Sequence, residues 1–104
     1  MRERDPAVYI LASRRNGTLY TGVTSDLVGR MSEHRQNLTP GFASRHGVHH
    51  LVYYEDHGTM PDAIGREKQI KKMSRAEKIA LIEAANPLWR DMWGEISGED
   101  DEEQ

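Results

Sequence analysis

The sequence predicts an α+β domain in which a small three-stranded antiparallel sheet is flanked by helices, in the order ββαβαα. Two observations carry this prediction: strand-like runs stand on both sides of an Asn-Gly pair, and helix-capping signals precede the later segments. With 104 residues, the chain is long enough for one domain with one modest core. We therefore expect a single domain over residues 1–94 and an acidic, disordered tail over residues 95–104.

Two strands joined by a tight turn open the domain. Residues 7–12 are apolar, aromatic or β-branched, as in a largely buried strand, and residues 18–23 return as its partner. Asn16-Gly17 between them is the strongest short signal for a hairpin, because both residues tolerate positive φ. Tyr9 and Tyr20 should therefore lie on neighbouring antiparallel strands, close enough to serve one site.

Capping and breaking signals define the later elements. Residues 24–26 (Thr-Ser-Asp) offer caps for a first helix, whose apolar stripe continues into His34. A threonine cap and a first-turn proline suit a second helix, and Ser74 begins a capping box for a third. The expected elements are a helix over residues 27–36, a loop over 37–50, a strand over 51–55, a helix over 61–73 and a last helix from Ser74 to Asn86-Pro87.

The charge distribution favours a polyanionic partner, although the formal net charge is −3. All 14 Lys and Arg residues lie at or before Arg90, whereas 11 of the 17 Asp and Glu residues lie at or before Gly94, so the body carries +3. A basic body with an acidic tail fits a binder of polyanions whose tail is solvated or competes for the basic face. A tail that only aids solubility is the alternative.

Composition also restricts the compartment and the kinds of site. The chain contains no cysteine, which excludes disulfides and thiolate metal sites and is typical of a reducing compartment. No apolar run approaches the length of a membrane span, and the first residues do not resemble a signal peptide. We expect a cytoplasmic protein with no membrane partner and with a monomer as the favoured oligomeric state.

Glu67 stands out in the helix expected over residues 61–73. On a helical wheel this carboxylate falls in the middle of an apolar stripe. The stripe consists of Met60, Ala63, Ile64 and Ile70. An inward carboxylate costs several kcal/mol unless it is paired. The residues alone leave two interpretations open: a half-buried salt bridge, for which Arg30 is available, and a metal ligand at the rim of the core.

Arg30 and His34 lie one turn apart and should project from the same face of the first helix. An arginine fork suits a phosphate, and a histidine can transfer protons near neutral pH. Taken alone, a solvated arginine and a packed histidine explain the pair equally simply. Gly22 likewise allows two interpretations, close approach of the backbone to a phosphate or tight packing within the sheet.

The two tyrosines belong to a recognisable pattern. Val8-Tyr9-Ile10 and, after the hairpin, Tyr20-Thr21-Gly22 resemble the paired signature of the GIY-YIG nuclease family. Residues 27–30, ending in Arg30, look like the segment with the family's helix arginine, and His34 stands at a spacing that some members use. The similarity is greatest to a compact stand-alone subgroup, the YhbQ-like or UPF0213-type proteins.

The resemblance continues through the second half of the chain and covers roughly residues 6–93. Glu67, within the segment 66–72, looks like the family's metal-binding glutamate, and Asn86 falls where the family keeps a late asparagine. The sequence also departs from the pattern. Val23 stands where some members place a lysine near the catalytic tyrosine, and His34 is the candidate to replace that basic group.

The resemblance implies a GIY-YIG fold and an endonuclease that hydrolyses phosphodiester bonds in nucleic acid, DNA more than RNA. Tyr9 or Tyr20 would activate water with help from His34, Arg30 would clamp phosphate, and Glu67 would hold Mg²⁺ or Mn²⁺. The expected substrate contacts are Gly22, Arg45, Lys68, Lys71, Lys72 and Asn86. The competing functions are a non-catalytic nucleic-acid-binding module with the same fold and a protein-interaction domain.

Overall fold

The computed structural model describes residues 5–36 and 48–98, so the expectations for Arg45 and for the end of the tail lie outside the described residues. Three strands form one sheet in the order β2-β1-β3, and both pairings are antiparallel. The predicted α+β class is therefore confirmed. The elements are β1 (Ala7–Ala12), β2 (Leu19–Thr24), α1 (Leu27–Arg35), β3 (His50–Asp56), α3 (Met60–Lys71), α4 (Arg75–Ala85) and α5 (Trp93–Ser97).

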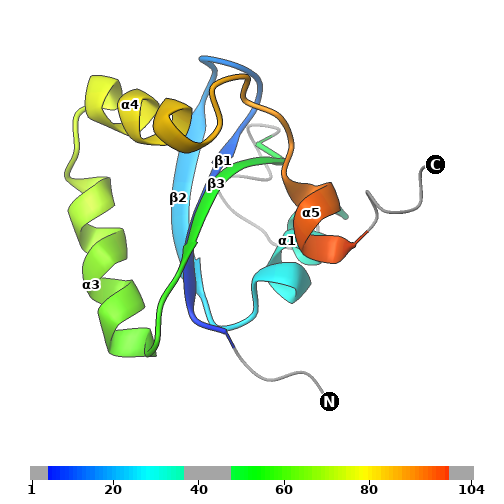
Figure 1. The fold of residues 1–104 in the computed structure, drawn as a ribbon, viewed down its shortest axis with the longest axis vertical. Coiled ribbons are helices and arrows are strands. Elements are labelled where there is room, and N and C mark those ends of the chain that lie inside the picture. Colours follow the sequence, from blue (N-terminus) through cyan, green and yellow to red (C-terminus); the bar gives the residue numbers. More distant parts are fainter. Residues whose placement is uncertain (1–4, 37–47, 99–104) are drawn as a thin grey trace.

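The central strand β1 is buried along its whole length, because helices cover both faces of the sheet (Figure 1). Alternate side chains of β1 point to opposite faces and enter two separate apolar clusters. Val8, Ile10 and Ala12 pack against α3 and α4. Ala7, Tyr9 and Leu11 pack against α1, with the partly buried apolar residues of α5 beside them.

The predicted hairpin is present, but its turn contains more residues than the Asn16-Gly17 pair. The amide of Gly17 donates to the carbonyl of Arg14 at 2.9 Å, and Ser13 N donates to Thr18 O at 3.0 Å. Only Asn16 of the expected pair takes a positive φ, at 58°. The extra residues move the start of the second strand to Leu19, one position later than expected.

The helix caps read from the sequence form as expected. Asp26 Oδ1 accepts from the amide of Gly29 at 3.2 Å, and Thr59 Oγ1 accepts from that of Asp62 at 3.3 Å. Ser74 closes a reciprocal capping box at the start of α4. Among the helices of the described segments, none is long and apolar enough to cross a membrane.

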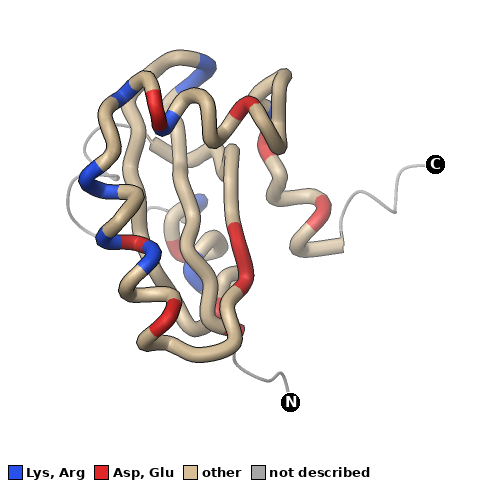
Figure 2. Tube along the Cα trace, turned by 60° about the vertical axis from the view of Figure 1, so that its left-hand side comes forward, with Lys and Arg blue, Asp and Glu red and all other residues tan. Residues whose placement is uncertain are grey.

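Basic residues are concentrated on one part of the surface, although Glu67 and Glu77 lie among them. Figure 2 shows Lys and Arg following one another along α3 and into the start of α4, whereas Asp and Glu mark the end of β3 and the helix α5. The acidic residues on these elements include Glu55, Asp56 and Glu95. The basic face expected from the charge distribution therefore lies over α3 and α4.

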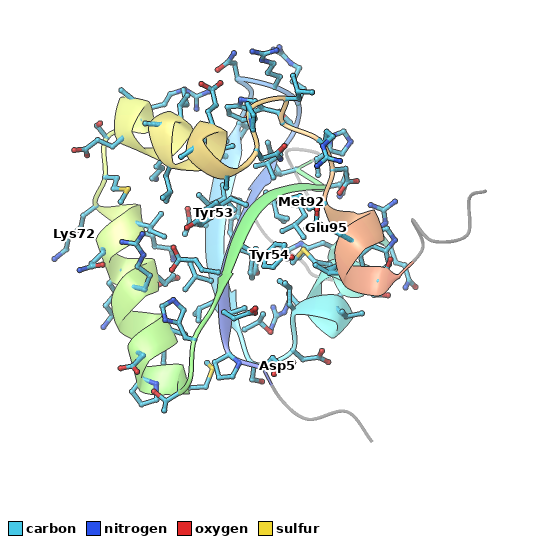
Figure 3. All side chains as sticks on the ribbon, viewed as in Figure 1. Asp5, Tyr53, Tyr54, Lys72, Met92 and Glu95 are labelled. Carbon is cyan, nitrogen blue, oxygen red and sulfur yellow. The ribbon has the colours of Figure 1, made fainter. Side chains whose placement is uncertain are left out.

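The chain after α4 returns along β3 instead of becoming a tail at Gly94. The amide of Met92 donates to Leu51 O at 2.7 Å, and Tyr54 Oη donates to Glu95 Oε1 at 3.2 Å (Figure 3). The helix α5 then continues to Ser97. The sequence predicts a tail from residue 95 because acidic residues dominate that segment. Ile96, however, packs on the apolar cluster that contains Tyr9, and it extends the ordered domain.

Candidate active site

Three aromatic rings meet on the face of the sheet that α1 covers. Tyr9 on β1 is paired with Gly22, and Leu11 is paired with Tyr20, so both tyrosines point to the same face. Their ring centroids are 6.3 Å apart, and the ring of His34 on α1 lies 6.0 Å from each of them. Tyr9 Oη is 3.4 Å from His34 Nε2. The predicted approach of the two tyrosines is therefore confirmed.

Gly22 makes room for the phenol of Tyr9. A Cβ atom on Gly22 would lie 2.4 Å from Tyr9 Oη and 2.5 Å from its Cζ, closer than such atoms approach. The Tyr9 ring therefore occupies the space over this backbone, and Gly22 itself is buried. This close approach supports the second interpretation of Gly22, tight packing within the sheet, and a phosphate contact at Gly22 stays a prediction.

Gly22→Ala should destabilise the protein, because the methyl group must displace the Tyr9 phenol. We expect a loss of about 1–3 kcal/mol in the free energy of unfolding, measured by denaturant titration. Gly65→Ala is the control, since a Cβ at this helical position meets nothing within 4 Å. That change should stabilise the protein by up to about 1 kcal/mol. Equal stability of Gly22→Ala and the native protein would contradict the packing described here.

Three charged residues shift the pKa of the Tyr9 phenol. Burial raises the pKa of Tyr9, and the phenol of Tyr20 raises it further. The guanidinium of Arg30 lowers this pKa, whereas the carboxylates of Glu67 and Glu33 raise it. Arg30 lies on α1 and Glu67 on α3, so charges from both helix layers influence this phenol.

The surroundings of His34 favour the neutral form of its imidazole. Its side chain is buried, and burial together with the charge of Arg30 lowers the pKa of the imidazole. Nε2 of a neutral imidazole can donate a hydrogen bond to the phenol or accept one from it, depending on the tautomer, but the ring supplies no positive charge. Among the charged neighbours of Tyr9, the guanidinium of Arg30 lowers the pKa of the phenol, and replacement by His34 of the basic group missing at Val23 stays a prediction.

Glu67 does form a salt bridge, but with a partner other than the one expected. Its Oε2 lies 2.8 Å from Lys71 Nζ, one turn further along α3, while Arg30 pairs with Glu33 at 3.6 Å. The Glu67 side chain is only 12% exposed, whereas that of Lys71 is 53% exposed. An ion pair with one solvated partner is worth at most about 1 kcal/mol, so Lys71 can readily be exchanged for another cation.

A polar cluster on the opposite face fixes the helix that carries Glu67. Arg66 Nε donates to both carboxylate oxygens of Glu55 on β3, at 3.0 and 3.1 Å. Glu55 also accepts from Tyr53 Oη and bonds His57 Nε2 at 2.8 Å. Burial would raise the pKa of Glu55, but the bonds from Arg66, Tyr53 and His57 together lower it. Sequence reasoning missed this cluster, because it joins a strand to a helix and follows no local pattern.

Asn86 has a structural task instead of the expected substrate contact. Its side chain is 2% exposed, and Nδ2 donates to Val52 O at 3.0 Å and to Arg90 O at 2.9 Å. Its Oδ1 accepts from the amide of Arg90 at 3.1 Å. Lys68 on α3 and Lys72 at its C-cap, in contrast, are exposed, as a substrate contact requires.

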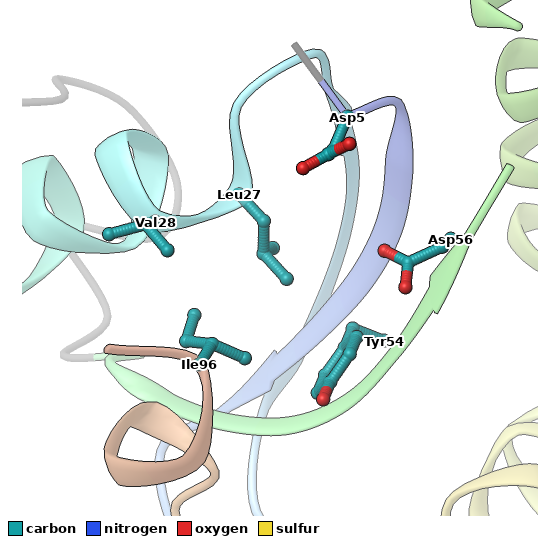
Figure 4. A pocket seen from close by; sticks show the side chains of 6 residues that line it. All are labelled: Asp5, Leu27, Val28, Tyr54, Asp56 and Ile96. Carbon is teal, nitrogen blue, oxygen red and sulfur yellow. The ribbon is translucent and has the colours of Figure 1, made fainter. Parts of the chain in front are cut away.

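A pocket of about 170 Å³ lies between α1, β3 and α5, but it belongs to a different part of the surface (Figure 4). Its walls contain neither the three rings nor Arg30 or Glu67. Leu27, Val28 and Ile96 form one side of it, and Asp5 and Asp56 bring carboxylates to the other. It therefore adds nothing to the candidate active site.

The sheet, the two tyrosines, the helix arginine and the glutamate of α3 define a class of protein. Residues 5–80 match the GIY-YIG catalytic domain, and the chain belongs to this family. It is 35% identical over 75 residues to UPF0213 proteins of Staphylococcus aureus strains Mu3 and Mu50, and this match covers 72% of the chain and 90% of each relative.

A solved structure supports the same fold. The solution NMR structure of a UPF0213 protein from Bacillus halodurans is similar to this chain with a TM-score of 0.54 and 24% sequence identity. The similarity covers 86% of this chain and 95% of the other. The predicted membership of the GIY-YIG superfamily and its UPF0213-type subgroup is therefore confirmed.

Proposed function

We propose that this protein is a metal-dependent endonuclease that hydrolyses phosphodiester bonds in nucleic acid, with DNA preferred to RNA. The observation that carries the proposal is the cluster of Tyr9, Tyr20 and His34 beside two charges of opposite sign. Arg30 and Glu67 both act on the Tyr9 phenol, so a phosphate and a metal ion placed near them would adjoin the rings. Phosphodiester hydrolysis needs these elements: a proton acceptor for water, and positive charge at the phosphate.

The carboxylate of Glu67 fits a hard divalent cation such as Mg²⁺ or Mn²⁺. Within residues 5–36 and 48–98, no group of three or more His, Asp or Glu side chains could hold a metal ion. A single carboxylate nevertheless suits Mg²⁺, which keeps most of its waters and binds substrate phosphates. When bound, the metal would neutralise the scissile phosphate and stabilise the leaving oxygen. Glu67 would exchange Lys71 for the metal.

Accessibility suggests how the two phenols divide the work. Tyr20 is half-buried, whereas Tyr9 is 1% exposed and faces His34. We therefore assign the proton transfer with water to Tyr20, the phenol that solvent can approach. Tyr9 positions Tyr20 through the ring cluster, and the neutral His34 holds the Tyr9 hydroxyl in place.

Arg30→Lys should lower kcat by about tenfold to a hundredfold and change KM little. Lysine keeps the charge but loses the planar fork that binds a phosphate through two parallel hydrogen bonds. Steady-state cleavage of a labelled duplex separates the two constants. Arg35→Lys is the matched control, because Arg35 lies on the same helix but pairs with Asp91 at 2.9 Å. A normal kcat with weakened binding would reassign Arg30 to substrate docking.

A non-catalytic nucleic-acid-binding module is the second candidate. The salt bridge of Glu67 with Lys71 favours it, because this pair satisfies the carboxylate without a metal. A panel of single-stranded, duplex, flapped and branched DNA, together with RNA, tests both functions with and without Mg²⁺. Mg²⁺-dependent cleavage of any member supports the nuclease. Binding without cleavage under every condition supports the module.

A further inference from the structure

One surface of the protein gathers half of its 14 Lys and Arg residues. We call it the basic ridge; it runs from the second half of α3 through the following turn to the start of α4, with the β1–β2 hairpin turn beside it (Figure 2). All of its members except the half-buried Lys78 are exposed. The basic ridge consists of Arg14, Arg15, Lys68, Lys71, Lys72, Arg75 and Lys78.

The pairing of these cations differs from that of arginines elsewhere in the molecule. Away from the ridge, three arginines bind carboxylates: the pairs are Arg30–Glu33, Arg35–Asp91 and Arg66–Glu55. On the ridge only Lys71 has such a partner among the described residues. Glu77 is nearby on α4, but its carboxylate accepts from the amide of Ser74 at 2.8 Å. The ridge therefore presents positive charge that the described part of the protein does not neutralise.

The ridge is assembled by a specific contact between distant segments. Arg75 Nη2 donates to the carbonyls of Asn16 at 2.8 Å and Gly17 at 2.7 Å, which fixes the hairpin turn against the start of α4. The two arginines of that turn thereby join the cations of the helices. A pocket of about 330 Å³ lies at this junction, with Arg75 and Lys78 on one side and Thr18 and Leu19 on the other.

We propose that the basic ridge binds the sugar-phosphate backbone of a nucleic acid, independently of its sequence, and that the pocket at the junction receives one phosphate. This proposal rests on the proposed function, because it extends the substrate from the ring cluster over α3. Lys68 follows Glu67 on that helix and Lys71 pairs with it, so the ridge begins beside the candidate metal ligand. A row of cations that mostly have no carboxylate partner in the described residues suits a repeating polyanion, and the phosphates of a nucleic-acid backbone carry no sequence information.

A membrane surface fits the ridge less well than a nucleic acid. Membrane-binding surfaces combine basic residues with apolar side chains that enter the lipid. The large hydrophobic residues exposed in the described part are Ile64 and Leu88, and neither belongs to the ridge. The ridge therefore offers positive charge without large exposed apolar side chains, and positive charge is what binding to a phosphate backbone requires.

The test measures binding without cleavage, on full-length protein that carries Glu67→Gln and contains no metal. Fluorescence anisotropy of a labelled DNA duplex gives the affinity between about 50 and about 200 mM salt. Lys72→Gln should weaken binding several-fold and reduce the slope of log affinity against log salt by about 0.9, since one phosphate contact is lost. Arg14→Gln combined with Arg15→Gln should reduce the slope by about 1.8.

Arg90→Gln is the matched control, because it removes one exposed positive charge away from the ridge. Affinity and slope should hardly change in this variant. Unchanged slopes in the ridge variants, or an equal loss in Arg90→Gln, would overturn the proposal. The proposal would also be overturned if the ridge variants lost binding to anionic vesicles but still bound DNA. If the binding depends on the ridge but the native protein with Mg²⁺ cuts no nucleic acid, the proposed nuclease activity is refuted and the ridge proposal stands.

Discussion

Glu67→Gln is expected to abolish metal-dependent cleavage and leave the fold intact. Glutamine keeps the size and the hydrogen-bonding oxygen of the side chain but loses the charge that a divalent cation requires. The described residues offer no cluster of carboxylates or histidines that could take over the ion. Loss of the salt bridge with Lys71 should cost at most about 1 kcal/mol of stability, because the lysine is solvated. Cleavage of labelled duplex DNA and thermal unfolding measure the two effects separately.

Asp62→Asn serves as the control for this experiment. It removes a negative charge from the same helix, at an exposed position in the first turn. Cleavage should remain normal, and stability should fall by less than about 1 kcal/mol. If Glu67→Gln cuts at the native rate and only melts at a lower temperature, the salt bridge is the whole role of Glu67 and the metal proposal ends.

Tyr20→Phe is expected to lower the cleavage rate by on the order of a hundredfold or more, the usual contribution of a general base. Phenylalanine keeps the ring that packs against Tyr9 and His34 and removes only the hydroxyl. Tyr9→Phe should lose less, since its hydroxyl positions the site rather than meeting water. Affinity for uncut substrate should hardly change in either variant. Single-turnover rates at saturating enzyme report the chemical step.

Tyr54→Phe provides the comparison for both tyrosine variants. Tyr54 lies on β3 directly opposite Tyr9, but its hydroxyl bonds Glu95 on α5. Removing that hydroxyl should leave the cleavage rate unchanged. A larger loss in Tyr9→Phe than in Tyr20→Phe would reverse the assignment of the two phenols. Full activity in both variants and in their combination would refute catalysis by tyrosine.

Local signals explain why most of the fold could be predicted from the sequence. A cap such as Ser74 acts on the amide three residues later, and a turn such as that at Asn16 joins adjacent strands, so cause and effect lie close together in the chain. The helix α5 was missed because its stability depends on distant contacts. Trp93 packs beneath Arg35, whose guanidinium carbon lies 5.1 Å from the centroid of the Trp93 ring. No local sequence pattern predicts that contact.

For the candidate site, the sequence predicts only which residues belong to it, and it does so through the spacing of a family motif. The motif indicates that Tyr9, Tyr20 and Arg30 act together, but not which atoms touch. Burial lowers the pKa of His34, and the helix geometry of α3 gives Glu67 a partner at Lys71 instead of Arg30. These outcomes depend on three-dimensional packing, which a linear pattern does not contain.

Asn86 shows a different kind of error, because a residue of the family motif was predicted to contact substrate but has a structural role in this fold. Val52 has no partner on β1, because the register of the two strands shifts between Ile10 and Leu11. The carbonyl of this bulged residue would lack a hydrogen bond in the sheet, and the Asn86 amide supplies one. Only the strand register reveals the need for that bond.

The return of the C-terminal segment along β3 also bears on self-association. β3 is an edge strand, and the free edge of a sheet is a template to which another chain can add a strand. Here Leu51 O accepts from Met92, and the Leu51 amide donates to Asp91 Oδ1 at 3.2 Å. The end of β3 is thus already occupied by the protein's own chain, and α3 packs along β2 at the opposite side of the sheet. A truncation after Ala85 would uncover β3 and turn a protected domain into one prone to aggregation through strand addition.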